Sequence, residues 1–115
     1  MQDLMAELQE KAGVLSKSVN ALRNNGIAYA RAEKDYKILL RQECLKLRDA
    51  GMPVGMIDKT CYGIPSVAEA RFKRDAQDAV YRANLEHINA VKLQLRLIES
   101  QIEREWGDYG RNKMD

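Results

Sequence analysis

Few residues of this chain have the type and spacing that catalysis requires. His87 is the only histidine among 115 residues, so any Ser–His or Cys–His pair must use it. It lies one residue before Ile88 and three after Asn84, at the edge of an apolar helical stripe. Cys44 and Cys61 are expected to be free thiols, since disulfides are rare in reducing compartments. The sequence therefore predicts a protein without enzymatic activity.

Metal and cofactor sites find no better support. There is no C-x-x-C or H-E-x-x-H pattern, and one imidazole is too few for a histidine-based metal site. Gly51, Gly55 and Gly63 lack the trailing Lys-Ser/Thr and the flanking strand of a phosphate-binding loop. Most carboxylates have a basic residue one helical turn away, which is typical of a solvated face. We expect no metal and no cofactor.

A group of basic residues gives the chain its one nucleic-acid signal. Residues 47–74 have the spacing of a helix-turn-helix, in which a short helix and a turn precede a longer helix. The side chains that would meet phosphates are Arg71, Lys73, Arg74 and Arg82. Asp75 and Asp78 are interleaved with them, and the net charge of the chain is only +2. DNA binding is therefore an alternative, ranked below a hairpin turn with a solvated face.

Two long amphipathic helices are expected to position these residues. The first runs from residue 2 to about residue 50, with apolar side chains every three or four positions. Asn24-Asn25-Gly26 is a breaker that predicts either a helix end or a kink at 24–26. We favour a continuous or merely kinked helix, because Leu22 and Tyr29 keep the apolar stripe in phase across it. Gly51, followed by Pro53, ends this helix.

Residues 51–65 form the connection, with a short helix opened by Pro53. This segment is too apolar for a solvated linker, so we expect it to fold back and plug the end of a helical hairpin. The alternative is an exposed, methionine-rich contact surface. The residues of that partner-binding surface would be Met52, Met56, Ile57 and Tyr62, with Arg71 and Arg74 beside them.

The second long helix is expected over residues 66–106, with Ser66 and Glu69 as a capping box at its start. A frayed tail should follow at 107–115. Leu93 and Leu97 lie off the main apolar seam of this helix and demand a third helix, either residues 4–22 or another subunit. The residues expected to build the core or the oligomer are those of the seam together with these two leucines, namely Tyr81, Ile88, Val91, Leu93, Leu95, Leu97, Ile98 and Ile102.

Together these elements predict one all-α domain over residues 1–115. Its fold would be an antiparallel, coiled-coil-like hairpin of long helices with a short helical plug at the turn. Because so thin a hairpin buries little surface, we expect it to pack as an oligomeric helical bundle, a dimer or higher. The chain starts without a secretory signal, and no uncharged apolar run could span a bilayer. A cytoplasmic location follows as the expectation.

Several short motifs recur in a known class of proteins. They are the turn from Leu47 to Val54, Tyr62-Gly63, Ala68 with Arg71, and the segment from Ile98 to Trp106. In these motifs the chain from Tyr29 onward resembles small helical accessory proteins from phages and prophages of Gram-positive bacteria. The resemblance implies a viral accessory origin and action in the host cytoplasm, and it carries no catalytic residues to transfer.

The leading functional interpretation is a non-enzymatic phage accessory protein that binds another macromolecule. It would be an adapter of phage replication or recombination, or an inhibitor of a host or defence protein. The alternatives are a DNA-binding protein that uses residues 47–74, and a structural phage component that assembles into large particles or filaments.

Overall fold

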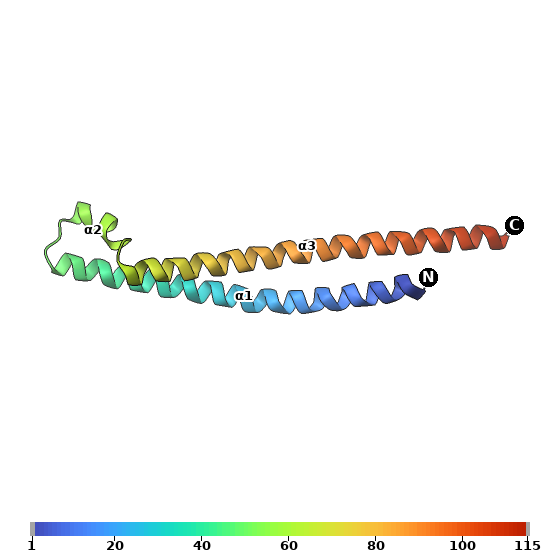
Figure 1. The fold of residues 1–115 in the computed structure, drawn as a ribbon, viewed down its shortest axis with the longest axis horizontal. Helices are drawn as coiled ribbons and strands as arrows, with labels where there is room; N and C mark the ends of the chain where they lie inside the picture. The colour runs from blue at the N-terminus through green and yellow to red at the C-terminus, as the bar shows by residue number, and fades with distance from the viewer. Residues whose placement is uncertain (1, 115) are drawn as a thin grey trace. The chain divides into compact units, whose positions relative to one another are not determined.

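The computed structural model describes residues 2–114 and contains three helices (Figure 1). They are α1 (Gln2–Asp49), α2 (Val54–Cys61) and α3 (Pro65–Met114). Residues 24–82 form one compact unit, and the chain up to Arg23 together with the chain from Ala83 forms another. In each unit α1 packs antiparallel to α3, and α2 lies in the connection between them. The predicted all-α hairpin with a short helix at its turn is confirmed.

Helix α1 is unbroken through Asn24-Asn25-Gly26, so the continuous helix is the alternative that the structure adopts. A Cβ added to Gly26 would lie 3.4 Å from Cε2 of Tyr81, at the limit of van der Waals contact. Glycine in a helix interior costs about 1 kcal/mol relative to alanine. At this position the missing side chain leaves room for the Tyr81 ring, and α1 and α3 can approach closely.

The chain leaves α1 through a glycine-based helix cap. Gly51 has a φ of 90°, the left-handed conformation that glycine adopts without strain. The amide of Met52 donates to the carbonyl oxygen of Leu47 at 3.1 Å, and the amide of Gly51 donates to the carbonyl oxygen of Arg48 at 3.0 Å. This pair of bonds defines a Schellman motif. Pro53 then occupies the N-cap of α2.

The ends of α3 differ from the prediction. The helix begins at Pro65, and the carbonyl of Ile64 accepts the amide of Ala68 at 2.9 Å, so Ser66 is not the N-cap. Proline suits the first helical position because the amide hydrogen it lacks would have no partner there. The helix also continues past Trp106 to Met114, which corrects the expected frayed tail over 107–114. Gly107 weakens a helix but retains its backbone donor, so it does not end one.

The core of the unit formed by residues 24–82 lies at the turn. Tyr36 of α1, Cys61 of α2 and Val67 of α3 are buried together. Cys61 and Val67 are completely inaccessible to solvent. Partly buried apolar side chains pack around these three, namely Leu39, Leu40, Cys44, Leu47, Ile64 and Ala70.

The other unit is held by a narrower seam. Ser18 of α1 and Ile88 and Val91 of α3 are buried, and the side-chain amide of Asn84 donates to the carbonyl oxygen of Ser18 at 3.1 Å. Leu93 and Leu97 are exposed on the outside of α3. The remaining residues of the predicted seam are half-buried, with Tyr81 in the unit of residues 24–82 and Leu95, Ile98 and Ile102 here.

The cap at Gly51 makes a testable prediction about stability. We expect Gly51→Ala to destabilise the fold by about 1–2 kcal/mol, because alanine is strained at positive φ. Gly13 is the matched control, since it lies inside α1 with nothing within 4 Å of an added Cβ. Gly13→Ala should stabilise the fold by about 0.5–1 kcal/mol. Urea denaturation followed by circular dichroism measures both, and equal effects at the two sites would contradict the cap assignment.

Candidate functional site

The turn of the hairpin rests on side chains that are withdrawn from solvent. Ile57 and Cys61 lie four residues apart and share the buried face of α2, and Ile57 is only 7% exposed. Cys61 packs in one cluster with Tyr36 of α1 and Val67 of α3, so α2 is fixed to both long helices. This burial corrects the placement of Ile57 in a partner-binding surface. Its side chain belongs to the plug.

Other side chains of the same segment point into solvent. Val54 is 78% exposed and Met56 is 56% exposed, while Tyr62 is exposed and Met52 is half-buried. The plug and the contact surface, which the sequence posed as alternatives, therefore coexist on different residues of one short segment. We call Val54, Met56 and Tyr62 the turn surface.

Sequence reasoning missed two exposed apolar residues near the turn. Neither Val54 nor Phe72, the single phenylalanine of the chain, is among the predicted partner-binding residues. Phe72 is exposed on α3. It lies five positions after the buried Val67, which places it about 140° around the helix from the core. That angle could have identified Phe72 as outward-facing once Val67 was assigned to the core.

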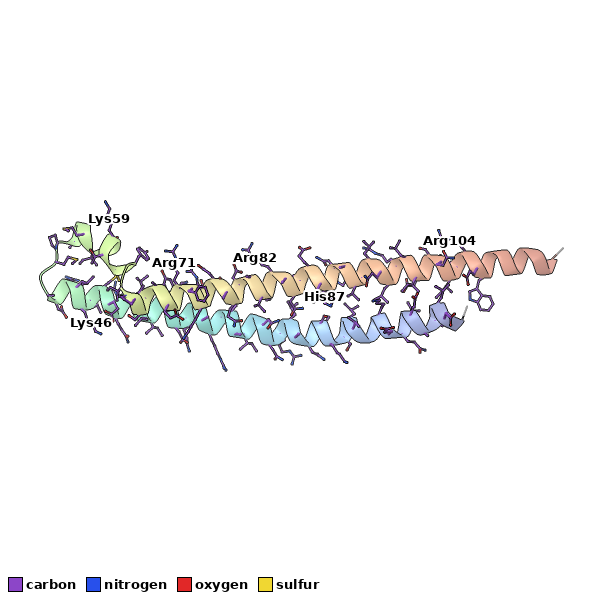
Figure 2. All side chains as sticks on the ribbon, in the orientation of Figure 1. Lys46, Lys59, Arg71, Arg82, His87 and Arg104 are labelled. Atoms are coloured by element: carbon purple, nitrogen blue, oxygen red, sulfur yellow. The ribbon has the colours of Figure 1, made fainter. Side chains whose placement is uncertain are left out.

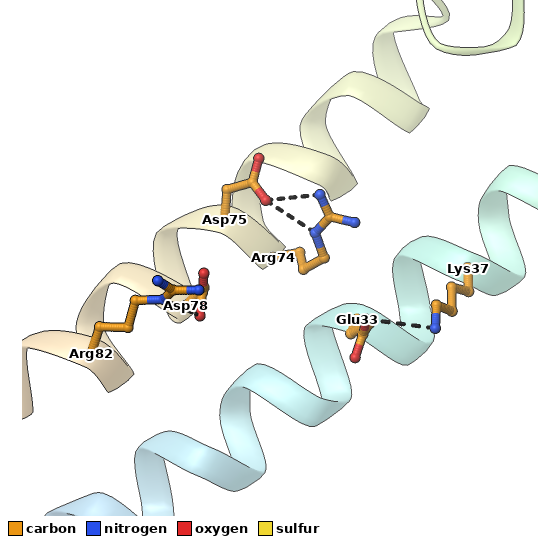
Figure 3. Close-up of polar contacts among 6 residues, drawn as sticks. All are labelled: Glu33, Lys37, Arg74, Asp75, Asp78 and Arg82. Carbon is orange, nitrogen blue, oxygen red and sulfur yellow. Dashed lines mark hydrogen bonds and ion pairs between the residues drawn. The ribbon is translucent and has the colours of Figure 1, made fainter. Parts of the chain in front are cut away.

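The two arginines predicted beside this surface have different roles. Arg71 is exposed, and its Cζ lies 5.7 Å from the centroid of the Tyr62 ring, next to the turn surface (Figure 2). The Cζ of Arg74 lies 4.6 Å from the centroid of the buried Tyr36 ring. Nε and Nη2 of Arg74 also donate to Oδ1 of Asp75 at 3.0 and 2.9 Å, which raises the pKa of Arg74 (Figure 3). Arg74 therefore covers the core and does not belong to the partner-binding surface.

The predicted phosphate contacts are partly engaged by carboxylates. Nε of Arg82 lies 3.2 Å from Oδ1 of Asp78, and Arg74 bonds to Asp75 as described (Figure 3). Only Arg71 and Lys73 of the four predicted residues have no carboxylate neighbour among the ion pairs of the described chain. Binding of a phosphate would have to compete with these carboxylates, which lowers the gain from each contact.

An open groove of about 690 Å³ lies between α1 and α3 within the unit of residues 24–82. Its walls combine alanines with charged residues of both signs. Arg31 and Lys73 are balanced by Asp35 and Glu69, so the groove has no net charge to attract nucleic acid. The lining residues are Ala28, Arg31, Ala32, Asp35, Leu39, Ser66, Glu69, Ala70, Phe72, Lys73, Ala76 and Gln77.

The two cysteines meet beneath the turn surface. Both are free thiols, and Sγ of Cys44 donates to Sγ of Cys61 at 3.3 Å. The Cys61 thiol in turn donates to the carbonyl oxygen of Leu40 at 3.6 Å. Burial, together with the hydrogen bond from Cys44, raises the pKa of Cys61 to about 11. At neutral pH Cys61 is therefore a protonated thiol that is shielded from solvent, and the half-buried Cys44 is the more accessible of the two.

Among the side chains that the structure describes, no group of three His, Cys, Asp or Glu could hold a metal ion. His87 is exposed on α3 (Figure 2). None of the helices in the described range combines the length and the apolar character needed to cross a membrane. Comparisons with protein-family models, with curated proteins and with solved structures find no match to this chain.

Neighbouring residues of α2 provide a paired test of this geometry. We expect Ile57→Asp to destabilise the fold by about 3–5 kcal/mol, because it buries an unpaired carboxylate and removes a core side chain. Met56→Asp should change stability by less than about 0.5 kcal/mol, since Met56 is exposed in the first turn of α2, where an acidic side chain is favourable. Thermal unfolding measures both variants. Similar losses for the two would show that Met56 is part of the plug.

Proposed function

We propose that this chain is a non-enzymatic binding protein that acts by holding another protein at its turn surface. The observation that carries the proposal is the exposure of Val54, Met56 and Tyr62 on a segment whose Ile57 and Cys61 are buried. An apolar side chain that stays exposed on a fixed backbone can bind without a loss of backbone conformational entropy. Solvent-exposed groups of this kind are typical of protein-interaction sites.

The chemistry of the turn surface favours a protein partner. Methionine adapts its shape to an apolar pocket, and tyrosine combines a large ring with a hydrogen-bonding hydroxyl. Arg71, stacked near Tyr62, adds a charged group that can pair with a carboxylate of the partner. Methionine, tyrosine and arginine are enriched in protein interfaces, and tyrosine and arginine also at their hot spots.

We further propose that the chain is an accessory protein of a phage or prophage of a Gram-positive bacterium, acting in the host cytoplasm. Its partner would be a protein of phage replication or recombination, for which it serves as an adapter, or a host or defence protein that it inhibits. The resemblance supports this class because its shared residues run through the same turn, from Leu47 to Val54 and on to Tyr62-Gly63.

Self-association is part of the proposed function. Outside the turn the hairpin leaves large apolar side chains in water, among them Leu85, Leu93 and Leu97. A second copy of the chain, in a dimer or larger bundle, would cover some of them and add buried apolar area. The turn surface remains available for a different partner in such an assembly.

DNA binding ranks below protein binding. A three-residue turn does join α2 to α3, as in a helix-turn-helix. However, Val67 in the first turn of α3 is completely buried, and Arg74 and Arg82 bond to carboxylates. The start of a recognition helix has to present its side chains to base edges instead. A structural role in phage particles is the remaining alternative and would require assembly into large particles.

The proposal is tested by affinity purification of the tagged protein from an infected host, read by mass spectrometry. Met56→Asp should reduce recovery of a specific partner by roughly tenfold or more, as expected for a hot-spot residue. Ile38→Asp is the matched control, because Ile38 is an exposed apolar residue of α1 outside the turn surface. Equal recovery with both variants contradicts the proposal. Retention on duplex DNA at low salt, or assembly into large particles, would favour the corresponding alternative instead.

A further inference from the structure

In the unit that comprises residues 1–23 and 83–115, two leucines on the outer face of α3 are not covered by α1. Leu93 is 51% exposed and Leu97 is 61% exposed. They lie on the side of the helix opposite Ile88 and Val91, which are buried against α1. Two leucines one turn apart on a solvated face form the centre of a potential helix–helix contact.

The residues around this pair are arranged symmetrically along the helix. Successive spacings of four, three, four, three and four residues keep the whole set on one face, and all six side chains are exposed. The order is charged, small, leucine, leucine, small, charged, and it reads the same from either end about position 95. The set is Glu86, Ala90, Leu93, Leu97, Ser100 and Arg104.

We infer that this face of α3 binds the same face of a second copy in an antiparallel, twofold-symmetric dimer. Leu93 of one copy then lies opposite Leu97 of the other, and the small Ala90 opposite Ser100. Glu86 meets Arg104 of the second copy at both ends of the contact. An interface between identical surfaces must be self-complementary, and the opposite charges at the two ends satisfy that requirement.

Electrostatics selects the antiparallel orientation over the parallel one. In a parallel pair Glu86 would face Glu86 and Arg104 would face Arg104, and like charges directly opposite one another repel. Arg104 lies on the side of α3 away from α1 (Figure 2), and Nη2 of its guanidinium donates to Oε1 of Gln101 at 2.5 Å. A guanidinium has five donor hydrogens, so it can also bind the carboxylate of Glu86 in the second copy.

The length of the contact sets its strength. From Glu86 to Arg104 the helix rises about 27 Å, at 1.5 Å per residue. A single helix pair of this length lies at the small end of specific interfaces, so we expect a dimer that dissociates in the micromolar range. The inference rests on the self-association proposed above and specifies its surface.

Sedimentation velocity of the purified full chain at about 1–100 μM tests the inference. The wild type should shift from monomer to dimer across this range, and Leu93→Glu with Leu97→Glu should remain a monomer. Val19→Glu is the control, because Val19 is exposed on α1 in the same unit and should leave the dimer unchanged. A wild-type chain that is monomeric throughout overturns both this inference and the proposed self-association.

Charge reversal separates the antiparallel dimer from any other assembly. Glu86→Arg alone and Arg104→Glu alone each place like charges opposite one another, and each should weaken the dimer about tenfold or more. The double variant restores opposite charges at both ends and should recover the wild-type dissociation constant. An oligomer that persists in the double-leucine variant, or charge variants without this recovery, overturns the surface while leaving self-association intact.

A second observation, independent of α3, concerns the cysteines under the turn surface. We infer that Cys44 and Cys61 form a reversible disulfide between α1 and α2 when they meet an oxidised low-molecular-weight thiol. Their sulfur atoms are already 3.3 Å apart, and a disulfide requires about 2.05 Å, so a small movement of α2 suffices. The bond would tie the base of the turn surface covalently to α1.

The chemistry proceeds by two thiol–disulfide exchanges. Cys44, the more accessible thiol, loses its proton and attacks one sulfur of glutathione disulfide, and one glutathione leaves. Cys61 then gives up its proton and attacks Sγ of Cys44, which releases the second glutathione. Two protein thiols are oxidised and one glutathione disulfide is reduced to two thiols. The burial of Cys61 favours this order, because Cys61 can be reached only by Cys44.

Incubation of the full chain with glutathione disulfide, followed by intact mass spectrometry, tests this inference. We expect a species lighter by two hydrogens, a rise in melting temperature of several degrees, and reversal of both by dithiothreitol. Cys44→Ser should show neither effect, and Cys61→Ser should stop at one glutathione adduct on Cys44. A wild-type chain that keeps both thiols, carries stable glutathione adducts, or links to a second chain overturns the inference.

Discussion

The burial of Cys61 and Val67 against Tyr36 is the interaction on which the rest of the molecule depends. Among the described residues, Cys61 and Val67 are the largest side chains that are fully buried, and both belong to the segment where the chain reverses. In a pair of helices alone, most of the circumference of each helix is exposed to water. The short helix α2 adds a third wall at the turn, so desolvation is complete there, and the reversal is stabilised by core packing in addition to its glycine cap.

Away from the turn the helices are amphipathic, and the hairpin covers their apolar side chains only in part. Apolar side chains that remain exposed are the basis of both proposed binding surfaces. The turn surface belongs to a segment that is fixed by the buried Ile57 and Cys61, which suits recognition of a separate partner. The outer face of α3 around Leu93 and Leu97 has no such backing within the hairpin and suits a copy of itself. The two exposed apolar surfaces thus differ in what lies behind them.

The long elements of the fold could be predicted because their signals repeat over many turns. Helical periodicity identified both long helices, and Gly51 with Pro53 located the reversal. The local signal at the start of α3 was misleading. Ser66 matches the N-cap of a capping box, but the helix already begins at Pro65, one residue earlier. The candidate site could be only half predicted, since α2 is eight residues long and apolar on several sides. Periodicity over so short a helix could not tell the buried Ile57 from the exposed Met56.

The hydrogen bond from Asn84 to Ser18 has a consequence for how the chain folds. It joins residues 66 positions apart, whereas the contact between Cys44 and Cys61 spans only 17. Closing the longer loop first would cost about 1 kcal/mol more in chain entropy, so we expect the contact at the turn to form before the contact between Asn84 and Ser18. The hydrogen bond from Asn84 to Ser18 then stabilises the correct alignment of α1 and α3. A slip of one heptad would separate its half-buried amide from the Ser18 carbonyl, which disfavours the misaligned hairpin.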